Sequence, residues 1–478
     1  MIGGMKRIAF ILLLAGAMPA AHAQDAASLQ KRIEGQLGVA SPGTRFGVVV
    51  TDPDGREIIA INPEGRFIPA SNTKMFTTAA AFMALGGLDQ PDVDGGTRVR
   101  IERDAKRKTH VVIEGRGDAR LSSAPDCVAD CLAMLADAVA AATRKVQDIV
   151  GDDTRFADQR WSPGMSWNNI PGKSGTAASA LSIDDNAIAM TVTPGTAGTK
   201  PTVSLPSYYS IDNRAVTGTA DSASTLAFDR APNGFVVSVT GSIPAGASPE
   251  TLVLSVDDPA YYAAWLMRAM LVARGVMVKG QVSARHRPAD MPAAPASQTP
   301  VLAALTPPPL SEDLTIINKT SQNLHAELIL RRLGSPMGIG SIADGLSVVR
   351  TMFDRAGVNP RHYAFSDGSG MSTYNRIAPR AMVTLLRWIA AQPWGAAWRA
   401  TLPVGGDGML ARRYAGTALA GRIFAKTGTL NATSALSGYL IARSGRTLTF
   451  STFANDVPEG DNAARAVDAA LIAIADAN

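Results

Sequence analysis

The chain has 478 residues, 46% of them hydrophobic, and a formal net charge of +5. It is too long for one ordinary domain, and its composition allows two or three domains with packed cores. The mild positive excess contains no basic run, which argues against nucleic acid as a partner and is compatible with a polyanionic one.

The first 23 residues predict a secretory signal peptide. Lys6 and Arg7 precede an apolar run over residues 8–18, and Ala21-His22-Ala23 is a small-x-small cleavage site. A membrane anchor is the alternative, but it needs about 20 apolar residues, and this run is shorter. We therefore expect cleavage after Ala23 and a soluble protein in the periplasm, without a transmembrane anchor.

The first part of the mature chain, residues 24–88, predicts a hairpin followed by a helix. Strands are expected over residues 46–50 and 58–60, with a turn at Pro53-Asp54-Gly55. Residues 71–85 have helical periodicity and stop at Gly86-Gly87.

Residues 89–287 predict a β-rich inserted region of one or two subdomains. Turns rich in Gly, Pro, Asn and Asp separate many short β-like runs, and helical patches interrupt them. The runs are residues 98–102, 110–113, 187–193, 225–229 and 235–240, and the helical patches are 128–142 and 259–274.

Cys127 and Cys131 lie four residues apart in a stretch predicted to be helical from residue 127 to 142. In an oxidising compartment they can form a disulfide if Cys127 sits at the helix end. Within a regular helix the geometry is poor, so two reduced, buried thiols are the alternative. We favour the disulfide, and expect no metal here because no histidine is near.

A connection and a C-terminal segment of helices and strands complete the chain. Residues 288–309 are dense in Pro and Ala and predict a linker or extended connection. Residues 310–478 predict helices and three strands, which with residues 24–88 suggest one split α/β domain. The helices are expected over 314–333, 343–356, 379–391 and 462–475, and the strands over 421–426, 434–442 and 447–454.

Three short motifs occur in one order: Ser71-Asn72-Thr73-Lys74, Ser321-Gln322-Asn323 and Lys426-Thr427-Gly428. Each is weak alone, because the chain holds a second copy of every pattern. The second copies are Ser28-Leu29-Gln30-Lys31, Ser166-Trp167-Asn168 and Lys173-Ser174-Gly175. Context favours the first set, which stands on a helix start and a strand end, and all three together in order are far more specific.

The chemistry of the first and third motifs fits nucleophilic catalysis. Positions i and i+3 share a helix face, so the Lys74 amine can reach the Ser71 hydroxyl, and burial would lower its pKa enough for it to act as a base. A capped surface helix is the alternative. At a strand edge, Lys426 would supply positive potential, Thr427 a hydroxyl for a carboxylate, and Gly428 room for a peptide added as a strand. Here a solvated strand end is the alternative.

Ser321-Gln322-Asn323 is the weakest motif taken singly. It lies in a predicted helix, where Ser and Asn are poor formers, and a surface polar turn is the alternative.

With these motifs the chain resembles the low-molecular-mass class C penicillin-binding proteins, the D-alanyl-D-alanine carboxypeptidases/endopeptidases of peptidase family S13. The long insertion between Lys74 and Ser321, the Pro308-Pro309-Leu310-Ser311 approach and the Asp367-Gly368-Ser369-Gly370 loop support the resemblance. It implies an α/β (α+β) fold with a β-lactamase/transpeptidase-like catalytic domain, an antiparallel sheet flanked by helices, and a large β-rich insertion.

The resemblance also implies the roles of the motif residues. Ser71 would be the nucleophile and Lys74 its general base, Ser321 would relay a proton to the leaving D-alanine nitrogen, Asn323 would bind the substrate backbone, and Lys426 would orient and polarise. The expected substrate-binding positions are Thr427, Gly428 and Thr429, the last sharing an oxyanion hole with Ser71. The implied substrates are peptidoglycan stem peptides and the implied inhibitors β-lactams, with no metal or organic cofactor.

Two further positions bear on the peptide stem. Asp153 resembles a substrate-facing position of the family, with a turn residue or cap as the alternative reading. Thr373 stands where relatives often carry arginine, which would weaken recognition of an acidic group on the peptide stem. The balance of carboxypeptidase and endopeptidase activity and the oligomeric state do not follow from the sequence.

Two other functions compete with this reading. A β-lactamase-like hydrolase would need an efficient deacylating carboxylate, and no clear glutamate motif supplies one. A non-enzymatic wall-binding protein would share the scaffold, but all motif side chains are present. Metallopeptidase and nucleophile-elbow esterase patterns, H-E-x-x-H and G-x-S-x-G, are absent from the sequence.

Overall fold

The computed structural model describes residues 18–292, 297–336 and 338–478, with only the backbone for 18–27. Most of the predicted signal peptide, residues 1–17, lies outside the described residues, so that feature stays a prediction. The described chain begins with helix α1 (Met18–Ala40). No helix of the described part is both long and apolar enough to cross a membrane.

A five-stranded antiparallel sheet joins the two ends of the chain. The order is β2-β1-β22-β21-β20, so that β20 forms one edge. Strand β1 pairs with β22 along its whole length, from Arg45 opposite Asn455 to Thr51 opposite Thr449. The strands are β1 (Arg45–Thr51), β2 (Glu57–Ile61), β20 (Ile423–Leu430), β21 (Thr433–Ile441) and β22 (Thr447–Asn455).

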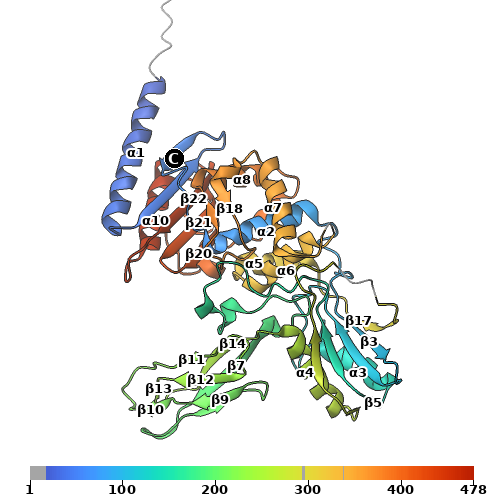
Figure 1. Ribbon diagram of the computed structural model, residues 1–478. Helices are drawn as coiled ribbons and strands as arrows, with labels where there is room; N and C mark the ends of the chain where they lie inside the picture. Colours follow the sequence, from blue (N-terminus) through green and yellow to red (C-terminus); the bar gives the residue numbers. More distant parts are fainter. Residues whose placement is uncertain (1–17, 293–296, 337) are drawn as a thin grey trace, which may run out of the picture.

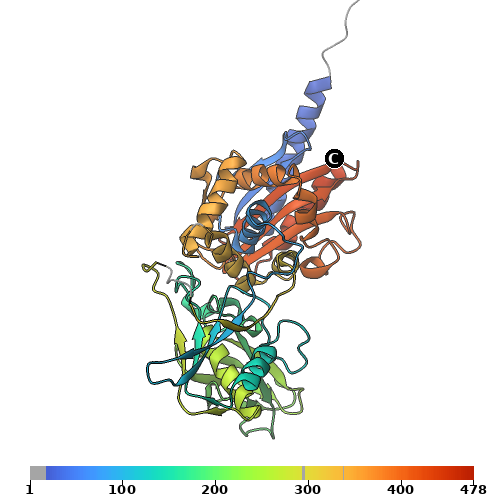
Figure 2. The ribbon, with the colours of Figure 1, turned by 90° about the vertical axis from the view of Figure 1, so that its right-hand side faces the viewer.

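Helices cover both faces of this sheet (Figure 1 and Figure 2). On one face, α1 and the last helix pack through residues such as Ile33 and Leu471 against Leu440 and Phe450. On the other face, Phe453 of β22 packs into a core built by the remaining helices. The helices are α2 (Thr73–Ala84), α5 (Leu310–Lys319), α6 (Asn323–Gly334), α7 (Ile342–Arg355), α8 (Pro379–Ala390), α9 (Gly395–Ala400) and α10 (Ala463–Ala477).

The segment between α2 and α5 forms a separate β-rich body with its own hydrophobic core, in the lower half of Figure 1. Its largest sheet has the order β16-β6-β4-β3-β17. Its elements are β3 (Arg98–Arg103), β4 (Thr109–Glu114), α3 (Leu132–Ala142), β5 (Lys145–Val146), β6 (Ile149–Asp152), β7 (Ala187–Thr193), β8 (Thr202–Ser204), β9 (Ser210–Asn213), β10 (Val216–Gly218), β11 (Ala227–Asp229), β12 (Val236–Thr240), β13 (Ser242–Pro244), β14 (Glu250–Ser255), α4 (Pro259–Ala273), β15 (Met277–Val278), β16 (Val282–Arg285) and β17 (Val301–Ala304).

Three predicted elements differ from the structure. The helix expected over 314–333 is two helices, because the chain breaks at Ser321, whose φ is +62°. The helix expected from residue 127 or 128 begins only at Leu132, since a turn closed by the Cys127–Cys131 disulfide precedes it. The expected connection 288–309 contains β17, which pairs with β3.

The loop between β18 (Tyr363–Ala364) and β19 (Arg376–Ile377) approaches the start of α2 very closely. Gly370 in this loop has a φ of +88°, and a Cβ atom there would lie 1.9 Å from the carbonyl oxygen of Ala70. Only glycine permits both the left-handed backbone and this distance. The loop and the residues before Ser71 are therefore fixed against each other.

Replacing Gly370 by alanine tests this contact. Gly357 is the matched control, because its φ is +70° but a Cβ there would meet no atom within 4 Å. Both variants suffer the left-handed strain, and Gly370→Ala alone adds a clash that costs about 1–3 kcal/mol more. We expect Gly370→Ala to show the larger fall in the free energy of unfolding, measured by denaturant titration. Equal losses in both variants would contradict the contact.

Candidate active site

Ser71 and Lys74 meet where a short 3₁₀ turn, Ala70–Asn72, leads into α2. The Lys74 Nζ atom lies 2.9 Å from Ser71 Oγ. Its other partners are Asn323 Oδ1 at 2.6 Å and the carbonyl oxygen of Ser369 at 2.6 Å. Ala70, directly before Ser71, has a φ of +46°, a strained backbone of the kind found at functional sites.

The environment of Lys74 favours its neutral form near pH 7. The side chain is fully buried, and burial lowers its pKa from 10.5 to about 7, although Asp367 and Glu327 act in the opposite direction. An ammonium has three N–H donors, which match the three acceptors around Nζ. A neutral amine keeps two donors for Asn323 and Ser369, which leaves its lone pair for the hydroxyl proton of Ser71.

The second and third motifs meet in the same site. Lys426 Nζ donates to Ser321 Oγ at 2.9 Å and to the carbonyl oxygen of Thr427 at 2.9 Å. Lys426 is fully buried, and burial, with the nearby charge of Lys74, holds its pKa well below the usual value. Ser321 has a left-handed backbone and lies at the junction between α5 and α6. Its hydroxyl therefore meets Lys426 from this junction and not from within a helix.

The edge strand β20 carries the predicted substrate-binding positions. Near the start of β20, Ile423 accepts a backbone hydrogen bond from Gly405, and Ala425 donates one to Pro403. The backbone N–H and C=O groups of Ile423 and Ala425 therefore point away from the neighbouring strand β21. Backbone direction repeats every second residue in a strand. The N–H groups of Thr427 and Thr429 therefore point to the same outer edge of β20. Both residues lie beyond the loop that covers the first residues of this strand.

Strand β20 also reaches the nucleophile. A Cβ on Gly428 would lie 2.6 Å from the carbonyl oxygen of Pro69 and 3.1 Å from the nitrogen of Ser71. The Asn72 side chain donates to the carbonyl oxygen of Lys426 at 2.8 Å. Glycine at this position thus lets the strand and the Ser71 turn come into contact, and the turn is anchored to the strand by Asn72.

Several residues of the site lay outside the sequence prediction. Glu327 on α6 accepts the N–H groups of Gly368 and Ser369 at 3.0 and 2.9 Å, which holds the Ser369 carbonyl on Lys74. Asp367 accepts the N–H of Gly370 at 2.9 Å, and burial with nearby Glu327 raises its pKa to about 6. The Asp367-Gly368-Ser369-Gly370 segment was the one signal in the sequence that pointed here.

One rejected motif copy also touches the site. Lys173–Gly175 form a 3₁₀ turn and no strand, but the Ser174 carbonyl accepts a hydrogen bond from Asn323 Nδ2 at 2.9 Å. Asn323 is therefore held from two sides, by Lys74 through its oxygen and by Ser174 through its nitrogen.

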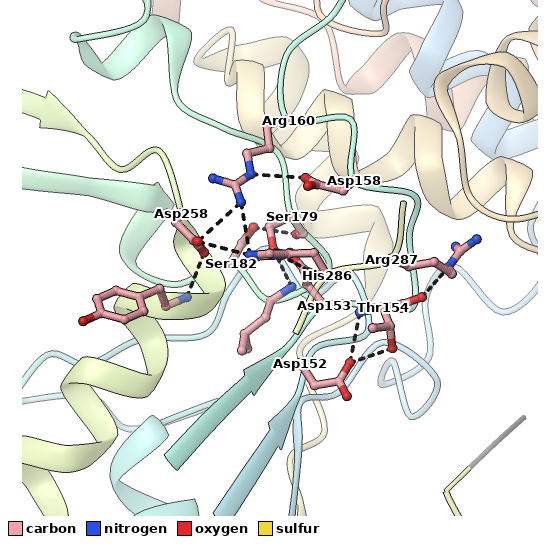
Figure 3. Close-up of polar contacts among 12 residues, drawn as sticks. Asp152, Asp153, Thr154, Asp158, Arg160, Ser179, Ser182, Asp258, His286 and Arg287 are labelled. Atoms are coloured by element: carbon pink, nitrogen blue, oxygen red, sulfur yellow. Dashed lines mark hydrogen bonds and ion pairs between the residues drawn. The ribbon is translucent and has the colours of Figure 1, made fainter. Parts of the chain in front are cut away.

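Asp153 lies in a different network, shown in Figure 3. Its carboxylate accepts a hydrogen bond from Ser179 Oγ at 2.8 Å and contacts His286 Nδ1 at 2.9 Å. The pairs formed by Asp153 and Asp258 raise the pKa of His286 to about 10, so this histidine is a cation that joins two carboxylates. The described contacts do not join Asp153 to the motif residues, and its substrate-facing role stays a prediction. Within the described residues, no three side chains gather as metal ligands.

Comparison with known proteins identifies relatives over nearly the whole chain. A D-alanyl-D-alanine carboxypeptidase of Actinomadura sp. (strain R39) is 36% identical over 470 residues, covering 92% of this chain and 85% of that protein. One from Haemophilus influenzae is 23% identical, covering 90% and 89%. The crystal structure of penicillin binding protein 4 from H. influenzae matches with a TM-score of 0.77 at 22% identity, covering 92% of this chain and 97% of that one, which confirms the expected fold.

The sequence model of the D-Ala-D-Ala carboxypeptidase 3 (S13) family matches residues 29–478. This match leaves only the first 28 residues of the chain outside it. The resemblance that the three motifs suggested is therefore confirmed at the level of the family. The chain belongs to the D-Ala-D-Ala carboxypeptidase 3 (S13) family and is a serine-type D-Ala-D-Ala carboxypeptidase.

Proposed function

We propose that Ser71 cleaves the D-alanyl-D-alanine bond of peptidoglycan stem peptides through an acyl-enzyme. The observation that carries this proposal is the contact of a buried Lys74 amine with the Ser71 hydroxyl, with two further acceptors fixing the amine. A serine hydroxyl is a weak nucleophile until a nearby base takes its proton. In this site Lys74 is that base.

In the acylation step, the neutral amine of Lys74 takes the Ser71 proton while Oγ attacks the carbonyl carbon of the penultimate D-alanine. The N–H groups of Ser71 and Thr429 stabilise the oxyanion. The hydroxyl of Ser321, held by Lys426, passes a proton to the leaving nitrogen. The carbon–nitrogen bond then breaks, which releases D-alanine and leaves the peptide esterified to Ser71.

Substrate binding in this proposal uses the open end of β20. The peptide adds to the outer edge as an extended strand, and its terminal carboxylate lies near the Thr427 hydroxyl and the Lys426 amine. Water hydrolyses the ester in the second step. In a D-Ala-meso-diaminopimelate cross-link, the amine of diaminopimelate takes the place of the leaving D-alanine nitrogen, so the site allows both carboxypeptidase and endopeptidase cleavage.

Acylation by a β-lactam tests the nucleophile. Benzylpenicillin should give a stoichiometric, long-lived adduct, read by intact-protein mass, and Ser71→Ala should give none. The control is Ser28→Ala, which removes the serine of the second S-x-x-K pattern and should still be acylated. Rapid turnover of the drug without an adduct would favour a β-lactamase, and no reaction at all would favour a non-enzymatic wall-binding protein.

The pH dependence of acylation tests the base. Because the Lys74 pKa is about 7 and the neutral amine is the reactive form, the rate should rise about tenfold per pH unit below this value and level off above it. Glu327→Gln removes a negative charge that raises this pKa, so the midpoint should move to lower pH. The second-order rate constant for acylation by benzylpenicillin, measured from about pH 5 to pH 9, gives both the shape of the profile and its midpoint. A flat profile would exclude Lys74 as the base.

We further propose export to the periplasm by a cleaved signal peptide. The support is the sequence of residues 1–23 and the cell-wall substrate of the proposed reaction. N-terminal sequencing of the protein recovered from the periplasmic fraction of an expressing Gram-negative host should begin at Gln24. Recovery only from the cytoplasm with the apolar run intact would contradict the proposal.

A further inference from the structure

A cavity in the inserted body has no lining residue in common with the Ser71 site. Its volume is about 360 Å³, within the range of small-molecule sites. Four aromatic side chains, those of Tyr208, Tyr209, Phe235 and Tyr261, form part of its wall. Polar side chains form the rest, among them Arg160, Asn233 and Asp258.

The rings of the aromatic wall pack against one another, yet part of the wall is open to solvent. The ring of Tyr208 is buried and packs edge-on against Phe235 and Tyr262, with centroids 5.5 and 4.8 Å apart. Phe235 keeps 49% of its surface exposed. An exposed aromatic side chain held against a pocket is a feature of binding sites rather than of a packed core.

The charged side chains of the cavity are locked by neighbours. Asp258 accepts the N–H of Tyr261 at 2.9 Å and contacts His286 at 3.1 Å, and His286 in turn contacts Asp153 (Figure 3). Arg160 donates to the Asp257 carbonyl oxygen at 2.8 Å. Polar groups fixed in this way are preorganised to recognise a ligand without a large ordering cost.

Other polar groups also belong to residues that line the cavity. These are the hydroxyls of Tyr208 and Tyr261 and the side-chain amide of Asn233, a residue exposed to solvent. Hydroxyls and amides both donate and accept hydrogen bonds. They suit a neutral ligand that itself carries hydroxyl and amide groups.

A chain of hydrogen bonds links the cavity wall to the loop of residues 166–175, which reaches the active site. At one end of the loop, the Ser174 carbonyl accepts from Asn323. Near its middle, the Ile170 carbonyl accepts from Ser255, which in turn accepts from Arg230 of the cavity wall at 3.0 Å. Two hydrogen bonds through Ser255 thus connect the cavity wall to the loop that supports Asn323.

We propose that this cavity binds a pyranose ring of the glycan strand to which the stem peptide is attached. A sugar ring presents an apolar C–H face that stacks on aromatic side chains, and hydroxyl and acetamido groups that bond to fixed polar side chains. The inference rests on the proposed function, because only a peptidoglycan substrate carries the peptide and the sugar in one molecule. It adds a glycan subsite to the peptide site.

The test separates sugar binding from catalysis. Ser71→Ala protein is titrated calorimetrically with the disaccharide of N-acetylglucosamine and N-acetylmuramic acid, without peptide. We expect saturable binding that Phe235→Ala in the same background weakens about 3- to 10-fold, the loss of one stacking contact. The matched control is Val236→Ala, a neighbouring apolar residue that is 55% exposed and follows Phe235 at the start of β12.

Active enzyme gives a second readout. The ratio of kcat/KM for disaccharide-pentapeptide to kcat/KM for free pentapeptide should exceed one, and Phe235→Ala should bring it towards one. Absence of disaccharide binding, or equal binding by Phe235→Ala and the parent, would overturn the glycan subsite while leaving the benzylpenicillin adduct in place. If Ser71→Ala protein bound the disaccharide but the unchanged protein formed no benzylpenicillin adduct, the proposed function would be contradicted and the glycan subsite would stand.

Discussion

The burial of one amine is the constraint on which the catalytic end of the molecule depends. Lys74 has no exposed surface, and an unpaired buried ammonium would be very costly. Three acceptors from three parts of the chain offset this cost: Ser71 from the same helix turn, Asn323 from α6, and the Ser369 carbonyl from a loop. Each acceptor requires its own support, so much of the surrounding structure is determined by this single side chain.

The support reaches back into the fold. Glu327 fixes the Ser369 loop, and buried Arg331 donates to Glu327 at 2.7 Å, one turn along α6. Asn323 begins the same helix. One helix therefore supplies both a direct partner of Lys74 and the carboxylate that positions another. The pairing of β1 with β22 joins the two parts of the catalytic domain in one sheet. It thereby brings Ser71 close to Lys426, although the whole insertion separates them in the sequence.

Much of the site followed from local sequence patterns. The spacing of Ser71 and Lys74 on a helix and the position of Lys426 in a strand are properties of short segments, and periodicity predicts them. The roles of Glu327 and the Ser369 carbonyl depend on contacts between distant segments, which no local pattern encodes. The break at Ser321 was missed because apolar residues on both sides continue a helical period, and β17 because prolines surround it. The pairing partner that makes β17 a strand, β3, is about 200 residues away.

The open end of β20 has a consequence for the behaviour of the protein in solution. An edge strand with free backbone groups is a template for any other extended chain, and proteins usually protect such edges. Here the loop through Val404 covers the beginning of the edge, whereas Thr429 near its other end is exposed. In the proposed binding mode, a covering strand there would block the substrate. The same backbone groups that would hold a stem peptide therefore make this short stretch the point where a misfolded or unfolded chain could pair, and its shortness limits that risk of aggregation.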